Sequence, residues 1–158
     1  MKDQAEPALP SPALPRRLAA LVYDSLLVLP IIMLLVALAT GLQIAVTGEA
    51  SAEDYSATLH PFVVQAIAVL TLLVFYGHFW RLKGQTLGMQ AWRIRLRSRH
   101  AQTITYRQVV VRCLGAMLSA APLGAGYWWC LFDQAGRSWH DHLSGTELEL
   151  LPKTVKKS

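Results

Sequence analysis

Two long apolar stretches dominate the pattern of hydrophobic and polar positions along this chain. Residues 18–39 and 61–80 are predominantly apolar, and each is about as long as a helix that crosses a bilayer. The first stretch predicts a helix from about residue 16 to residue 40, ended by Gly41. Pro30 lies near its middle and is expected to kink it, which membrane helices tolerate when neighbours satisfy the freed carbonyl. The pattern therefore predicts two transmembrane helices.

A third apolar segment, residues 108–132, is interrupted in its middle. Pro122, Gly124 and Gly126 fall within five residues and predict a break. The arms on either side are too short to cross about 30 Å of hydrocarbon at about 1.5 Å per residue. A re-entrant or interfacial helix–break–helix fits this pattern. The alternative is a single third span, which would place the C-terminus outside.

Two short runs, residues 92–97 and 146–150, alternate strictly between apolar and charged positions. This is the period of a half-buried strand. The first run carries arginines and the second carries glutamates: Arg93, Arg95, Arg97, Glu147 and Glu149. Opposite charges facing each other across a strand pair are stabilising, so the runs are predicted to pair. Residues 103–105 are expected to add a third short strand.

The charge distribution orients the predicted spans. The net charge of the chain is +5. Hydrophobic residues make up 53% of it, and its mean hydropathy is +0.32. Residues 81–107 contain seven Lys or Arg and no acid, whereas residues 41–59 contain three acids and no Lys or Arg. Because cytoplasmic loops carry the excess of basic residues, the N-terminus and residues 81–107 are expected to be inside. Strand pairing then places the C-terminus inside too.

Together these patterns predict an all-α membrane protein. It has two transmembrane helices, a broken, re-entrant or interfacial third segment, and a small cytoplasmic antiparallel β element. We expect a disordered arm over residues 1–15, a membrane domain over 16–151 and a basic tail over 152–158. Residues 41–59 form the outer loop.

Asp24 is a charge in the first apolar stretch. A carboxylate inside a membrane costs roughly 2.5–3.5 kcal/mol on insertion scales, so a function and a partner are expected. Arg17 lies seven residues earlier on the same helix face, and Arg112 lies near the start of the third segment. Both arginines are candidate partners, and an ion pair between Asp24 and Arg112 is geometrically possible. Asp24 then either carries Na⁺ or H⁺ or belongs to a static structural pair.

Several short motifs occur in a set order along the chain: the stretch from Arg17 to Asp24, the turn Gly84-Gln-Thr86-Leu-Gly88, Arg112, Asp133, and the run from Arg137 through His140 and Asp141 to Thr146. This order resembles the RDD family of small prokaryotic membrane proteins, named for one arginine and two aspartates. The resemblance implies a protein of the bacterial cytoplasmic (inner) membrane, in which Arg17 is the family arginine and Asp24 the first aspartate. Asp141 is the second, with Asp133 as the alternative. Some family members have been proposed to exchange sodium for protons, and for most no activity is assigned.

Other chemistry is disfavoured by the spacing of the candidate residues. His140, Asp141 and His142 diverge too much along a helix to hold one metal ion, and Cys113 and Cys130 suggest buried side chains. No catalytic motif or cofactor site is expected. The basic stretch 93–107 favours anionic lipid headgroups over nucleic acid. A homo-oligomer is expected to enclose any ion pathway. Two functions compete: cation/proton exchange through Asp24, and a non-transporting scaffold that binds a partner or anionic lipid through its basic cytoplasmic face.

Overall fold

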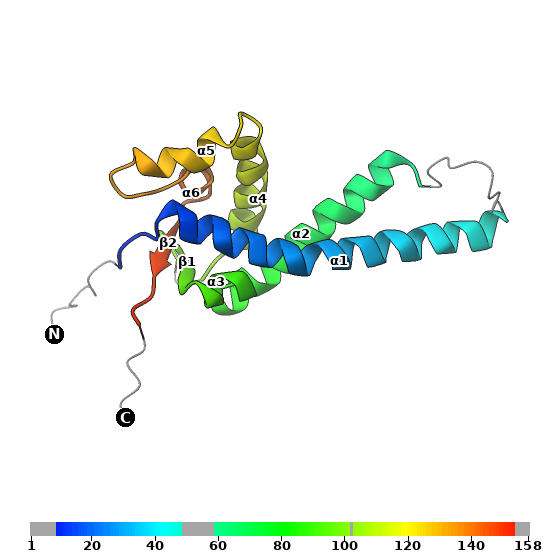
Figure 1. Ribbon diagram of the computed structural model, residues 1–158, viewed down its shortest axis with the longest axis horizontal. Coiled ribbons are helices and arrows are strands. Elements are labelled where there is room, and N and C mark those ends of the chain that lie inside the picture. The colour runs from blue at the N-terminus through cyan, green and yellow to red at the C-terminus, as the bar shows by residue number, and fades with distance from the viewer. Residues whose placement is uncertain (1–8, 49–58, 102, 154–158) are drawn as a thin grey trace, which may run out of the picture.

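The computed structural model of the chain describes residues 9–48, 59–101 and 103–153. Its longest elements are helices α1 (Leu14–Thr47) and α2 (Pro61–Lys83), with 34 and 23 residues. At about 1.5 Å per residue they measure about 51 and 35 Å, against about 30 Å for the hydrocarbon core of a bilayer. Both are long and apolar enough to cross a membrane. They form a hairpin that projects from one end of the molecule (Figure 1).

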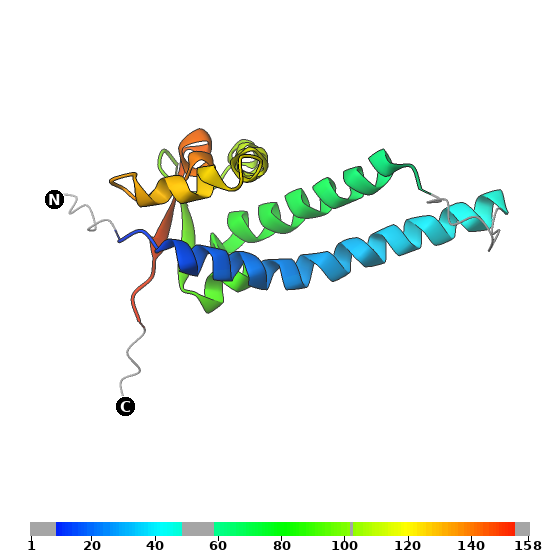
Figure 2. The same ribbon diagram turned by 45° about the horizontal axis from the view of Figure 1, so that its top comes forward.

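The remaining elements gather at the other end of the hairpin, around the start of α1. We call this end the base. Its elements are α3 (Leu87–Ala91), β1 (Ile94–Ser98), α4 (Tyr106–Ala120), α5 (Ala125–Trp128) with a 3₁₀ turn (Trp129–Leu131), α6 (Trp139–Ser144) and β2 (Thr146–Leu150). Figure 2 shows α4, α5 and α6 on one side of α1. The buried apolar cluster lies here: Ala20, Trp80, Met89, Ile94, Leu96, Ile104 and Val109.

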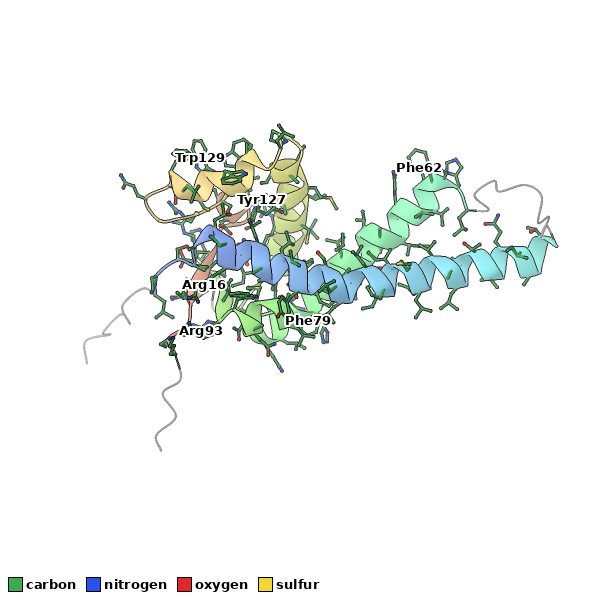
Figure 3. All side chains as sticks on the ribbon, viewed as in Figure 1. Arg16, Phe62, Phe79, Arg93, Tyr127 and Trp129 are labelled. Atoms are coloured by element: carbon green, nitrogen blue, oxygen red, sulfur yellow. The ribbon has the colours of Figure 1, made fainter. Side chains whose placement is uncertain are left out.

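The far part of the hairpin has almost no packing partner within the chain. The buried residues of α1 all lie in its first half, three or four positions apart and therefore on one face: Leu14, Arg17, Ala20, Asp24 and Val28. Beyond Val28, the described part of α1 has no buried side chain. Figure 3 shows the side chains of this region pointing outward, with Phe62 at the far end of α2. This surface matches a bilayer rather than water.

The two predicted strands pair as expected. β1 and β2 are antiparallel, with Arg95 opposite Glu149 and Arg97 opposite Glu147. Arg95 and Arg97 both contact Glu149, at 2.9 and 3.0 Å. The predicted third strand at 103–105 is wrong. Thr105 instead caps α4, because its hydroxyl accepts from the Gln108 N–H while the Gln108 side chain accepts from the Thr105 N–H.

The break in the third apolar segment is confirmed. The axis turns by 108° between α4 and the α5–3₁₀ unit. Gly124 takes the left-handed conformation that the turn requires (φ +78°). Gly126 packs so closely that a Cβ there would lie 2.5 Å from Ser119 Cβ. At 15 residues, α4 reaches about 22 Å, which is shorter than the hydrocarbon core of a bilayer.

The predicted end of the first helix needs correction. Gly41 does not end α1, which continues through apolar residues to Thr47 and is capped by Gly48 at φ +71°. Pro30 lies inside the continuous helix. Of the arm expected over residues 1–15, residues 1–8 lie outside the described residues. The described part packs on the base, since Pro10 O accepts from Leu150 N and α1 begins at Leu14.

Candidate functional site

Three charged residues from three elements meet in the base, and we call this cluster the arginine–aspartate lock: Arg17 of α1, Arg112 of α4 and Asp141 of α6. Asp141 Oδ2 lies 3.2 Å from Arg17 Nη1, and Asp141 Oδ1 lies 2.5 Å from Arg112 Nη1. The three side chains are 7%, 6% and 0% exposed. Buried charges need such partners, because desolvation of an unpaired one is costly. The lock therefore ties the first helix to the last helix of the chain.

Arg17 uses every donor of its guanidinium group. Besides Asp141, it donates to Ser138 Oγ at 3.1 Å, Pro12 O at 2.9 Å, Ser11 Oγ at 2.7 Å and the Gly136 carbonyl. The acceptors come from the segment before α1 and the loop before α6. Arg17 thus holds two irregular segments against α1, which is more than an arginine that anchors a helix end would do.

Asp141 is fixed by the start of α6. Its Oδ2 accepts from the Ser138 N–H at 2.8 Å. Asp141 is the third residue of α6 and forms a capping box with Ser138, the residue before the helix. Burial alone would raise the pKa of Asp141, but Arg112, His140, the Ser138 N–H and Arg17 together lower it. Asp141 is therefore ionised. Arg112 also donates to Thr146 Oγ1 at 2.7 Å, which links the lock to β2.

Asp24 forms a second buried contact, to the turn that begins α3. Thr86 Oγ1 donates to Asp24 Oδ2 at 2.6 Å, and the Gly88 N–H donates to Oδ1 at 2.9 Å. Thr86 also caps α3 by accepting from Met89 N. A Cβ at Gly88 would lie 2.3 Å from the Ala20 carbonyl, so only glycine allows this approach. Gly84 precedes the turn at φ +66°, and its carbonyl accepts from Leu96 N at 2.7 Å.

The contact with α3 fixes the depth of Asp24. Thr86 and Gly88 come directly after the basic end of α2, which carries Arg81 and Lys83. Asp24 therefore lies at the base end of the hairpin, close to the basic end of α2. From Asp24 to Thr47, α1 runs a further 23 residues, or about 35 Å, which alone covers the hydrocarbon core. One face of residues 14–24 packs on the base, and the part of α1 beyond Asp24 is by itself long enough to span.

The candidate ion pair between Asp24 and Arg112 is therefore not formed. Arg112 binds Asp141, and Asp24 takes a hydroxyl and a backbone N–H instead of a cation. Their similar distance from the membrane edge suggested contact, but the turn that begins α3 supplies the donors that satisfy the Asp24 carboxylate. The capping residues Ser138 and Thr86 had no signal in the helical periodicity, because α3 and α6 have five and six residues. Serine or threonine before a short helix was the available signal.

The remaining predicted residues have separate partners. Asp133 closes its own loop by accepting from Ala135 N, Arg137 N and Arg137 Nε, and the Arg137 N–H is the main cause that lowers the Asp133 pKa to about 2. His142 Nε2 lies 3.2 Å from Asp133. His140 is buried against Tyr127, and its Nδ1 has no partner among the described residues. Burial, then Arg112, lowers the His140 pKa to about 3, so the ring is neutral. Asp141, not Asp133, thus occupies the buried position.

A cavity of about 340 Å³ lies between the two charged contacts and opens between α1, α2 and α4. Its base end is lined by Arg17, Asp24 and Arg112, and its other end by apolar side chains such as Leu72, Leu73 and Met117. Among the described residues, no group of three or more His, Cys, Asp or Glu is placed to hold a metal ion. This cavity is a candidate site for a bound molecule.

These features define a class: a small integral membrane protein with a helical hairpin whose compact base is held by buried arginine–aspartate contacts. A family model described as the RDD family matches residues 11–145, and the chain belongs to this family. The predicted resemblance is confirmed. No curated protein and no solved structure matches the chain.

Proposed function

We propose that the chain is a non-transporting anchor and docking protein of the bacterial cytoplasmic membrane, with both termini in the cytoplasm. The hairpin holds it in the bilayer, and the base presents a basic surface to anionic lipid headgroups or to an acidic partner. The orientation is supported by the basic residues at the base end of both spans and by the acids that the sequence places between α1 and α2.

One observation carries the proposal against ion exchange. From Ser25 to the end of α1, and along α2 before Arg81, the described residues include no Asp, Glu, Lys or Arg. Charged side chains within membrane spans commonly mark an ion pathway through the hydrocarbon. Here the charges are confined to one end, and Asp24 already accepts from Thr86 and Gly88. The charged residues are arranged to assemble the base.

The basic surface supports docking. Arg95 and Arg97 remain 45% and 57% exposed although they contact Glu149, and Arg81 stacks on Tyr106 at 3.8 Å. Each Lys or Arg near an anionic leaflet contributes about 1 kcal/mol of attraction. We also propose that copies associate through the unpacked hairpin faces.

The deciding experiment measures Na⁺ and H⁺ flux in proteoliposomes of the wild type and of Asp24→Asn. We expect both to match empty vesicles. In the same preparations, native mass spectrometry should find anionic lipid retained by the wild type and less retained by Lys83→Gln with Arg93→Gln. Arg137→Gln serves as the control because Arg137 binds Asp133. If the wild type carries Na⁺ or H⁺ and Asp24→Asn does not, the proposal is overturned.

The second candidate is cation/proton exchange through Asp24. Its support is that Asp24 lines the cavity, next to the Thr86 hydroxyl. It requires other copies to complete the pathway, so flux should then depend on the protein density in the vesicles.

A further inference from the structure

The cavity between α1, α2 and α4 has a polar end and an apolar end. The polar end lies in the base, beside the lock and Asp24, and it includes Tyr76 and Tyr127. The apolar end runs up between α2 and α4 along Val69, Leu73 and Met117. Its volume of about 340 Å³ is in the range of small-molecule sites. In Figure 1, α4 and α2 diverge above α1 at this place. The polar end therefore meets the membrane boundary and the apolar end enters the membrane.

The charged groups that line the cavity differ in how many of their hydrogen-bonding groups are already used within the chain. All five N–H donors of the Arg17 guanidinium group make hydrogen bonds, and both oxygens of Asp24 accept them. Arg112 donates through Nη1 alone, to Asp141 and Thr146. Its Nε–H and both Nη2–H groups have no acceptor within the described part of the chain, although the side chain is 6% exposed. Because Arg112 lines the cavity, these donors are available to an acceptor that is bound there.

Neutral donors accompany Arg112 at the polar end. Tyr76 and Tyr127 both line the cavity, and neither hydroxyl has a hydrogen-bond partner among the residues that the structure describes. His140 also lines it and has its unpartnered buried Nδ1. The unmatched groups are thus mainly donors, which suits an anion rather than a cation.

We propose that this cavity binds an anionic amphiphile with one acyl chain in the site, its acidic head on Arg112, Tyr76 and Tyr127 and its chain between α2 and α4. A long-chain carboxylate and an acidic phospholipid share this chemistry. The site is distinct from the basic outer surface and goes beyond the proposed docking function. Planar guanidinium groups bind carboxylate and phosphate oxygens well, and the apolar end removes the chain from water.

The test uses the full chain in nanodiscs of phosphatidylcholine and a fatty acid with a photoreactive diazirine on its chain. We expect crosslinks on α2 and α4 at cavity residues, mapped by mass spectrometry. Unlabelled fatty acid should compete, and an alkyl amine of the same length should not. If phosphatidylglycerol in the nanodisc competes as well, a bilayer phospholipid is the natural source of the same anionic head. If it does not, a free carboxylate is the source.

Two sets of variants locate the site without touching the lock. Ala116→Trp fills the cavity, whereas Leu118→Trp adds the same ring to the exposed side of α4 and is the matched control. Ala116→Trp should lower labelling about tenfold or more and Leu118→Trp should leave it unchanged. Tyr76→Phe with Tyr127→Phe removes only two oxygens, and it should weaken binding about tenfold even if the tryptophan variant misfolds. Labelling that the amine probe matches, or that neither variant set reduces, would overturn the proposal. The ion-flux measurement tests the proposed function and does not test this binding site.

Discussion

At the scale of single residues, Asp141 is shared by two arginines from different helices. Replacing it with Asn keeps the shape but leaves two buried guanidinium groups without their common charge. We expect Asp141→Asn to lower the free energy of unfolding by about 3–5 kcal/mol, measured by thermal or denaturant unfolding in detergent. Asp133→Asn is the control, since its ion pair with Arg137 lies in a peripheral loop, and it should cost about 1 kcal/mol or less. Equal losses would show that the lock contributes nothing beyond a surface contact.

Asp24 gives a second test of the residue-scale contacts. Because its partners are a hydroxyl and a backbone N–H, Asp24→Asn strands no arginine, and the amide still offers one oxygen acceptor. We therefore expect a loss of about 1–3 kcal/mol, smaller than for Asp141→Asn. Thr86→Val removes the same hydrogen bond from the other side, and the double variant should be less costly than the sum. Additive losses would mean that Asp24 and Thr86 do not act together.

His140 should make stability depend on pH. Burial, then Arg112, holds its folded-state pKa near 3, well below the ordinary value of 6.5. As pH falls below about 6.5 the unfolded chain binds a proton that the folded protein does not, so stability is complete above this pH and declines towards pH 3. The slope is at most about 1.4 kcal/mol per pH unit. His140→Phe keeps a ring against Tyr127 and should flatten unfolding curves between pH 6.5 and 4. An unchanged slope would contradict this assignment.

At the scale of elements, the β1–β2 pair joins two segments about fifty residues apart through Glu149. Arg95 lies directly opposite Glu149 and diagonal to Glu147. In a double-mutant cycle with Arg95→Glu, Glu149→Lys should therefore recover about 0.2–1 kcal/mol and Glu147→Lys less. Unfolding in detergent measures both couplings. The same coupling for both glutamates would mean that the register is not fixed.

The turn between α4 and α5 depends on a glycine for close packing. Gly126→Ala places a Cβ 2.5 Å from Ser119, so α5 must move from α4, and a loss of about 1–3 kcal/mol is expected. Gly41→Ala is the matched control, since it is the same change inside α1 and nothing lies within 4 Å of the added Cβ. It should stabilise the protein by about 0.4–1 kcal/mol. Thermal unfolding of both variants decides. A neutral Gly126→Ala would show that the bend does not need the contact.

At the scale of the whole molecule, the sequence predicts most elements but not how the charges pair. The spans, the strand register and the break follow from local periodicity and turn residues, which act over a few positions. The end of α1 was harder to predict, because Gly41 lies inside the helix and the apolar residues after it carry the helix on to Thr47. The choice of Asp141 over Asp24 for Arg112 depends on how α3 and α6 pack, and elements of five or six residues leave no periodic signal.

The orientation of the hairpin is the last prediction at this scale. The ends of the span are marked by Thr47 on one side and by the base on the other, where the basic residues of β1 and the start of α1 gather, with Arg16 and Arg93 in Figure 3. The inward preference of Lys and Arg then places the base in the cytoplasm. Thr47→Cys should react with a membrane-impermeant maleimide in intact cells, whereas Lys153→Cys should react only after permeabilisation. The wild type, with Cys113 and Cys130, gives the background. Labelling of Lys153→Cys in intact cells would reverse the topology and remove the basis for a cytoplasmic docking surface.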